Sequence, residues 1–227
     1  TEMALAVCYP NAGNLGGGGF MVYRTHQGEV GALDYREKAP LGANRDMFLD
    51  ENKKYLQDKS KTGGLAVGVP GTIAGIFKAH KKFGSLPMQT ILRPVILLAK
   101  NGFKITEKQA KQFNDYSAVF KQVNQENSIY TKKFKPGDVF KNEALANTLQ
   151  QISDNGRSAF YQGDIAKTLV AFLQKNGGIV SLKDLDNYQA IWREPIVFNY
   201  KDLRIISMSP PSSGGICMAQ ILNTTPN

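Results

Sequence analysis

Charged residues that could bind a substrate stand together after an apolar stretch, at Asp34, Arg36 and Glu37. The guanidinium of an arginine is planar and can hold a carboxylate through two parallel hydrogen bonds, which a lysine cannot copy. Arg36 could therefore receive a substrate carboxylate. The alternative is structural, because an arginine at a strand end commonly pairs with an acid of the same fold, and Asp34 or Glu37 could serve. The residues alone leave both interpretations open.

Four consecutive glycines, Gly16 to Gly19, form the second unusual feature. Glycine loses about 0.5 to 1 kcal/mol relative to alanine on folding, so such a run implies a positive φ or the close approach of another backbone or a substrate. Phosphate-binding loops follow a strand, enter a helix and carry Lys and Ser or Thr after the glycines. This run follows a predicted helix and enters a predicted strand. The order disfavours phosphate binding and favours close packing, with a plain tight turn as the alternative.

Hydroxyl groups that could act as nucleophiles occur at Ser212 and Ser213, after two prolines, and at Thr1. A catalytic serine needs a base, but His26 lies in a predicted turn and His80 in a predicted helix, and neither is near a Gly-x-Ser-x-Gly sequence. A Ser/His hydrolase is therefore disfavoured, and Ser213 is expected to cap the last helix. Thr1 is discounted as an N-terminal nucleophile because the residues after it look helical.

The composition is that of a globular protein and excludes several classes. The chain has 227 residues, 42% of them hydrophobic and 21% charged, with a net charge of +9. Its lysines are dispersed, without a long basic run or an RNP-type signature, which favours solvated surface over nucleic-acid contact. No apolar stretch reaches the roughly 18 residues that a membrane-spanning helix requires.

The two cysteines and the ends of the chain add further expectations. Cys8 and Cys217 lie in no CxxC or Cys/His cluster, so no metal site is expected. The chain begins with neither an initiator methionine nor a signal sequence, in what looks like the middle of a helix. It also stops abruptly after a predicted helix, and we interpret it as a piece of a larger protein.

Strands are predicted near both ends of the chain. Two runs rich in β-formers, 20–24 and 30–35, flank the polar segment 26–29 and predict a hairpin. Both runs are apolar at nearly every residue, which predicts strands that are covered on both faces. Two further strands are expected over 190–200 and 203–208, joined near Lys201.

Helices are expected to fill the middle of the chain, and an exposed loop is expected over 53–64. With strands near 20–36 and 190–208 around a helical middle over 70–188, the chain reads as a mixed α/β (α+β) protein. The order lacks alternating βαβ units, which disfavours a doubly wound dinucleotide fold. The predicted helices are 70–83 with Gly84 as its stop, 92–100 with Gly102, 107–122, 142–154 with Asn142 as N-cap and Leu145, Leu149 and Ile152 inward, 163–175 with Ile165, Leu169, Phe172 and Leu173 inward, a short helix after the capping box Ser181–Asp184, and 215–223.

Four motifs then occur in a characteristic order. They are the glycine-rich segment 13–20, Asp-Tyr-Arg-Glu-Lys-Ala-Pro over 34–40, Gly-Val-Pro-Gly-Thr over 68–72, and Pro-Pro-Ser-Ser-Gly-Gly over 210–215. Together, the four motifs indicate a protein family far more specifically than any one of them does. The chain resembles the large subunit of bacterial gamma-glutamyltranspeptidases over essentially its whole length.

The resemblance implies an N-terminal nucleophile hydrolase, a four-layer αββα sandwich made as a precursor that cuts itself into a large and a small subunit. The nucleophile is then the first threonine of the small subunit, so residues 1–227 would form a single partial domain with no catalytic residue of its own. Ser212 and Ser213 are not the serine pair that contacts substrate in the small subunit of that family. The implied partner is that small subunit, with no cofactor or metal, in a periplasmic or secreted enzyme.

The resemblance also gives Arg36 and Glu37 a role. Arg36 stands where the family holds the α-carboxylate of a γ-glutamyl donor such as glutathione, and Glu37 either orients Arg36 or meets the donor's ammonium group. The implied cycle passes through a γ-glutamyl ester on threonine, followed by transfer to an amino acid, a peptide or water. The alternatives are an acylase or poly-γ-glutamate depolymerase of the same fold, or a non-catalytic scaffold with a basic binding surface.

Overall fold

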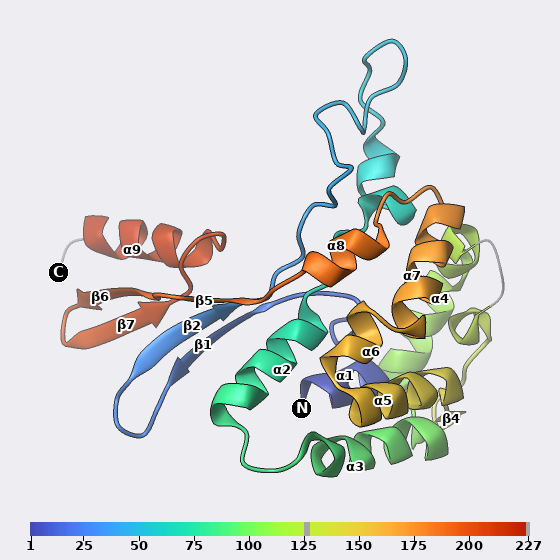
Figure 1. The fold of residues 1–227 in the computed structure, drawn as a ribbon, viewed down its shortest axis with the longest axis horizontal. Helices are drawn as coiled ribbons and strands as arrows, with labels where there is room; N and C mark the ends of the chain where they lie inside the picture. Colours follow the sequence, from blue (N-terminus) through green and yellow to red (C-terminus); the bar gives the residue numbers. More distant parts are fainter. Residues whose placement is uncertain (125–127, 226–227) are drawn as a thin grey trace.

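The computed structural model describes residues 1–124 and 128–225 and mixes helices with strands. Figure 1 shows that most helices gather in one body, from which the strands extend toward a separate C-terminal unit. The helices are α1 (Glu2–Cys8), α2 (Thr72–Phe83), α3 (Met88–Asn101), α4 (Glu107–Asn124), α5 (Glu143–Asn155), α6 (Arg157–Tyr161), α7 (Asp164–Lys175), α8 (Leu182–Asn187) and α9 (Gly214–Thr224); the strands are β1 (Phe20–Arg24), β2 (Val30–Asp34), β3 (Phe103–Lys104), β4 (Val139–Phe140), β5 (Ile191–Arg193), β6 (Ile196–Tyr200) and β7 (Leu203–Ser207).

The predicted hairpin is confirmed, and it forms part of a three-stranded antiparallel sheet in the order β1-β2-β5. The central strand β2 is buried at four of its five residues, as its continuous apolar run predicts. The expectation that β1 is also covered on both faces is wrong, since Val22 is 40% exposed. The position of β1 at the sheet edge explains the difference. Apolar residues on an edge strand need not be covered from both sides.

The strand expected over 190–200 is divided in two. β5 pairs with β2, whereas β6 pairs with β7 in a separate two-stranded sheet. The break falls at Glu194 and Pro195, because a proline has no N–H with which to continue a ladder. The closing helix α9 is confirmed and packs on β6 and β7. We call residues 196–224 the C-terminal arm (Figure 1).

Residues 1–190 outside the hairpin form what we call the helical body, and its core is built on α3 and α5. Asn142 caps α5 as predicted, accepting a hydrogen bond from the Leu145 N–H at 3.0 Å. Leu149 and Ile152 then turn inward and are fully buried. α3 begins four residues before the expected start and contains Pro94 in its interior. The exposed loop expected over 53–64 is confirmed for most of its residues, although Gly64 is buried.

Two details of the middle of the chain correct the sequence interpretation. The segment over 70–188 is not wholly helical, since β3 and β4 pair there as a small sheet. The inward face of α7 is also rotated: its buried residues are Ala166, Val170 and Leu173, while the larger Ile165, Leu169 and Phe172 are only partly buried. Ala166 is fully buried, and α7 packs against α6.

Candidate functional site

The charged motif lies immediately beyond the end of β2, and its first acid belongs to a buried ion pair. Asp34 is the last residue of β2, and its Oδ2 accepts from both the Nε and the Nη2 of Arg193, each at 2.8 Å. Its other oxygen, Oδ1, accepts the backbone N–H of Arg36 at 3.0 Å. The structural interpretation of Arg36 required a pairing with Asp34 or Glu37. Asp34 is satisfied by another arginine instead.

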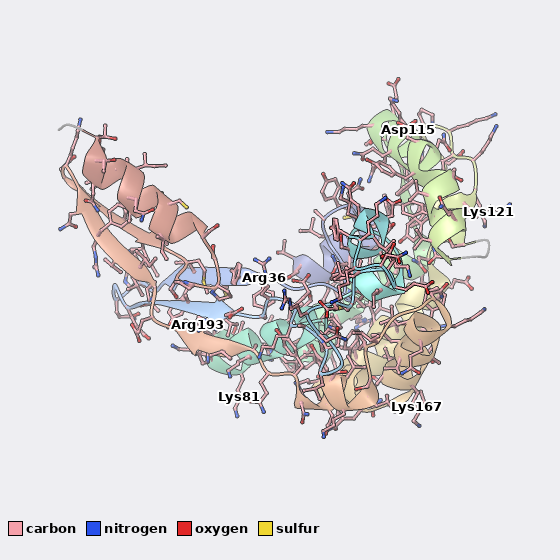
Figure 2. All side chains as sticks on the ribbon, turned by 90° about the horizontal axis from the view of Figure 1, so that it is seen from above. Arg36, Lys81, Asp115, Lys121, Lys167 and Arg193 are labelled. Carbon is pink, nitrogen blue, oxygen red and sulfur yellow. The ribbon has the colours of Figure 1, made fainter. Side chains whose placement is uncertain are left out.

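The side chain of Arg36 is exposed and makes no hydrogen bond or ion pair with any residue in the ranges 1–124 and 128–225. The guanidinium carbon lies 5.9 Å from the centre of the Phe20 ring. Figure 2 shows Arg36 where the hairpin leaves the helical body, facing the open side between the body and the C-terminal arm. The guanidinium is therefore available to a ligand.

The backbone of the motif is held between two glycine-containing segments. Tyr35 exchanges hydrogen bonds with Gly19, and Lys38 exchanges them with Val69. The carbonyl of Arg36 itself accepts from the hydroxyl of Tyr188 at 2.7 Å. The motif thus has a fixed course although it continues past the end of the sheet.

Close packing explains Gly18 and Gly19 of the glycine run, whereas a Cβ on Gly16 would meet nothing within 4 Å. A Cβ on Gly18 would lie 2.6 Å from the Tyr35 carbonyl oxygen and 2.7 Å from the Glu37 nitrogen, and a Cβ on Gly19 would lie 2.8 Å from the Tyr35 ring. Neither glycine is among the residues with a positive φ. Glycine is therefore required at these positions because another backbone approaches closely, and not because φ is positive.

The glycine run also forms hydrogen bonds with the start of α2. These bonds give a physical reason for the prediction that the run does not bind phosphate. The carbonyl of Gly17 accepts the N–H groups of Gly71 at 2.7 Å and of Thr72 at 2.9 Å. Free N–H groups at a helix start are what attract anions, and here two of them are already used. α2 consequently begins at Thr72, two residues after the proline that was expected to open it.

Glu37 is exposed like Arg36, and it lies between two glycines. A Cβ on Gly68 would come within 3.0 Å of the Glu37 Cβ, and one on Gly18 within 2.8 Å of its Oε2. These positions place the first part of the Glu37 side chain against Gly68 and one of its carboxylate oxygens against Gly18. A cation and an anion on adjacent residues match the carboxylate and ammonium of an amino-acid headgroup.

Two residues of the site, Arg193 and Tyr188, were not found by sequence reasoning. They lie 159 and 152 positions from their partners in the motif. Burial raises the pKa of the Tyr188 phenol above its usual range, and the nearby Tyr161, Asp34 and Glu37 raise it further. The hydroxyl consequently stays protonated and donates to the Arg36 carbonyl. No local pattern marks either residue, because both act across the fold.

The other candidate nucleophiles remain outside this site. Ser213 occupies the N-cap position of α9, as expected, but its side chain makes no capping hydrogen bond. The Gly214 N–H instead points to the Ser212 hydroxyl at 3.4 Å. His80 interacts with the Leu86 carbonyl at 2.8 Å, and within the described ranges no hydrogen bond connects a histidine with either serine.

Within residues 1–124 and 128–225, no group of three or more His, Cys, Asp or Glu side chains is arranged to hold a metal ion. The same residues contain no helix with the length and apolar character needed to cross a membrane. The apolar cavity of about 320 Å³ between α1, α4 and α5 is lined by neither Arg36 nor Glu37. The candidate site is therefore an exposed surface outside this cavity.

Comparisons with known proteins agree with the motifs. The family model described as gamma-glutamyltranspeptidase matches residues 1–227. The chain is 42% identical over 228 residues to a glutathione hydrolase proenzyme of Escherichia coli, covering 99% of this chain and 39% of that protein. A glutathione hydrolase proenzyme of Pseudomonas aeruginosa is 40% identical and is covered to a similar extent, 40% of its length. The chain thus spans about two fifths of these curated relatives.

Solved structures give the same result for the fold. The gamma-glutamyltranspeptidase of Helicobacter pylori superposes with a TM-score of 0.91 and 42% identity, over 98% of this chain and 65% of that chain. The transpeptidase enzyme CapD of Bacillus anthracis superposes less well, with a TM-score of 0.76 and 26% identity, over 97% of this chain and 69% of that one. The mixed helix-and-strand fold expected from the resemblance, that of N-terminal nucleophile hydrolases, is confirmed.

Proposed function

We propose a function for this chain on the basis that it belongs to the gamma-glutamyltranspeptidase family. The chain supplies the donor-binding part of a γ-glutamyltransferase, an enzyme that transfers the γ-glutamyl group of glutathione or a related donor to an amino acid, a peptide or water. In this proposal, residues 1–227 act as a single partial domain of the large subunit. The observation that carries it is the unengaged Arg36 guanidinium at the end of a rigidly held motif.

Arg36 holds the α-carboxylate of the donor through two parallel hydrogen bonds. Donors of this class carry that carboxylate at a fixed distance from the γ-carbonyl, so one clamp sets the position of the reacting carbon. Glu37, the exposed residue that follows Arg36 in the chain, meets the donor's ammonium group or orients the guanidinium. Both contacts exist before and during reaction, so they contribute mainly to substrate binding.

The nucleophile comes from a partner, the small subunit released when the precursor cuts itself. Its N-terminal threonine attacks the γ-carbonyl and forms a γ-glutamyl ester, which an acceptor or water then cleaves. The open side of the candidate site, between the helical body and the C-terminal arm, is where such a partner would complete the pocket (Figure 2). A periplasmic or secreted location, as in bacterial members of the family, goes with this proposal.

The test is the removal of the Arg36 side chain in the full-length, processed protein. We expect Arg36→Ala to lower kcat/KM for glutathione about 10- to 100-fold, the loss expected for a charge-assisted contact of about 1.5 to 3 kcal/mol, and to act mostly on KM. Arg45→Ala is the matched control, because Arg45 is a highly exposed arginine that forms an ion pair with the adjacent Asp46 and, among the described residues, with no other acid. Glutamate release from glutathione is the measurement.

The outcomes separate the alternatives. Equal kinetics for Arg36→Ala and Arg45→Ala would remove the donor clamp. An absence of glutathione hydrolysis in the processed wild-type protein, with salt-sensitive binding of acidic partners, would favour a non-catalytic scaffold. Efficient cleavage of poly-γ-glutamate or of acylated cephalosporins, but not of glutathione, would favour a different enzyme of the same fold.

A further inference from the structure

The direction of the Arg36 side chain depends on how its own peptide groups are held. β2 ends at Asp34, so both peptide groups of Arg36 lie beyond the sheet ladder. Side chains replace the ladder at this residue: the N–H donates to Asp34, and the carbonyl accepts from Tyr188. Of these two side chains, only Tyr188 comes from outside the motif.

Tyr188 is itself fixed firmly enough to act as an anchor. It is 2% exposed, and its ring stacks on that of Tyr161 with the centres 5.9 Å apart and an angle of 10° between the planes. Its backbone N–H donates to Leu185 at the end of α8. The phenol therefore reaches the Arg36 carbonyl from a buried and well-packed base.

The segment that follows Tyr188 is held by three cations from three elements. The carbonyls of residues 188–190 accept, in that order, from Arg157 of α6, from Lys38 of the charged motif at 3.1 Å, and from Lys78 of α2 at 2.7 Å. Hydrogen bonds from charged donors are stronger than neutral ones. This segment is consequently tied to the helical body on one side and to the Arg36 motif on the other.

Gly71 provides the space through which the phenol reaches Arg36. A Cβ at this position would lie 2.1 Å from the Tyr188 Oη and 2.0 Å from the Tyr35 carbonyl oxygen. The φ of Gly71 is −116°, which any residue can adopt, so the requirement is one of space and not of backbone conformation. The Gly-Val-Pro-Gly-Thr motif thus contributes to the Arg36 site by leaving room for a hydroxyl.

We propose that Tyr188 is a positioning residue for the donor site, whose hydroxyl fixes the Arg36 carbonyl and thereby aims the guanidinium. The proposal rests on the proposed function, because it concerns the same arginine. Without the hydroxyl, the Arg36 carbonyl loses its hydrogen bond, and the backbone that carries the guanidinium is held less firmly, although Tyr35 and Lys38 keep their own backbone hydrogen bonds. Donor binding then weakens, while the threonine that attacks the γ-carbonyl is unaffected.

The test uses Tyr188→Phe in the full-length, processed enzyme with glutathione as the donor. We expect KM to rise about 2- to 10-fold, the range for one lost hydrogen bond, with little change in kcat. Tyr130→Phe is the control, since this change also removes a largely buried phenol hydroxyl, one in the smaller apolar cluster that contains neither Arg36 nor Tyr188. Both variants lose stability, but only Tyr188→Phe is expected to change KM.

A double-mutant cycle with Arg36 distinguishes positioning from general loosening. If Tyr188 acts through Arg36, Tyr188→Phe leaves KM unchanged in the Arg36→Ala background. The same fold increase in both backgrounds would overturn the proposal. If Arg36→Ala raises KM and Tyr188→Phe does not, only the positioning role fails, whereas an unchanged KM for Arg36→Ala defeats the donor clamp and this proposal with it.

Gly71→Ala tests the contact between Tyr188 and Arg36 in a second way, by filling the space that the Tyr188 hydroxyl occupies. The added methyl group would occupy the space of both the Tyr188 hydroxyl and the Tyr35 carbonyl oxygen, so a KM increase at least as large as that of Tyr188→Phe is expected. Combining Gly71→Ala with Tyr188→Phe should then give no further increase beyond that of Gly71→Ala alone. Fully additive KM increases would contradict a shared action through the Arg36 carbonyl.

Discussion

The helical body and the C-terminal arm differ in how far their apolar side chains are buried. In the body, Leu149 and Ile152 are fully buried at the α5 face that packs on α3. In the arm, Leu203 is 57% exposed and Ile221 is 63% exposed, although both belong to regular elements. The body therefore supplies its own core, whereas the arm presents an apolar surface to its surroundings.

The candidate site lies where these two regions meet. Arg36 stands near the junction in Figure 2, on the side of the molecule that opens between the body and the arm. The body fixes the site from beneath through Tyr188, which packs among its buried residues. An arm that exposes apolar residues beside an open site fits a partner subunit that covers both.

The largest effect is expected in the core of the body. Leu149→Ala removes a fully buried side chain and should lower the free energy of unfolding by about 2 to 5 kcal/mol. Urea denaturation followed by circular dichroism measures this loss. A loss below about 1 kcal/mol would indicate that α3 and α5 do not form the main core, and the contrast between the two regions would disappear.

An intermediate effect is expected at a polar contact within the body. Asp184 accepts the Leu41 N–H at 2.6 Å and the Ser181 N–H and hydroxyl at 2.8 and 2.6 Å. Asp184→Asn weakens these bonds and should cost about 1 to 3 kcal/mol at neutral pH, as for hydrogen bonds to a charged group. Guanidinium denaturation of both proteins at pH 7 gives the difference.

The same residue makes a prediction about pH. Burial raises the pKa of Asp184, but hydrogen bonds from Ser181 and Leu41 outweigh burial and lower the pKa below its ordinary value of 3.8. The contribution is therefore complete above pH 3.8 and is lost as the pH falls through the lower folded-state pKa. Asp184→Asn should remove this part of the acid sensitivity. Parallel pH profiles for the two proteins would contradict the assignment.

The smallest effect is expected in the arm. Ile221→Ser changes a side chain that is already largely in water, so the free energy of unfolding of this chain should change by less than about 0.5 kcal/mol. Thermal unfolding at several protein concentrations is the measurement. A large loss that depends on concentration would mean that a second copy of the chain covers this face, and the arm would then resemble the body.

Features set by neighbouring residues could be predicted from the sequence. The hairpin turn, the Asn142 cap and the capping box of Ser181 and Asp184 all form within a few residues, so their local pattern is sufficient. Predictions failed where packing decided. The buried face of α7 consists of Ala166, Val170 and Leu173, and the strand expected over 190–200 breaks at Pro195, so that its two parts belong to different sheets.

The sequence by itself determined the family, the motif that contains Arg36 and Glu37, and most of the secondary structure, because each is written in short and local patterns. Only the tertiary structure decided that Asp34 pairs with Arg193 and that Tyr188 holds the Arg36 carbonyl. These contacts join segments more than 150 positions apart. Their partners are chosen by how the sheet and helices pack, and no spacing along the chain records that choice.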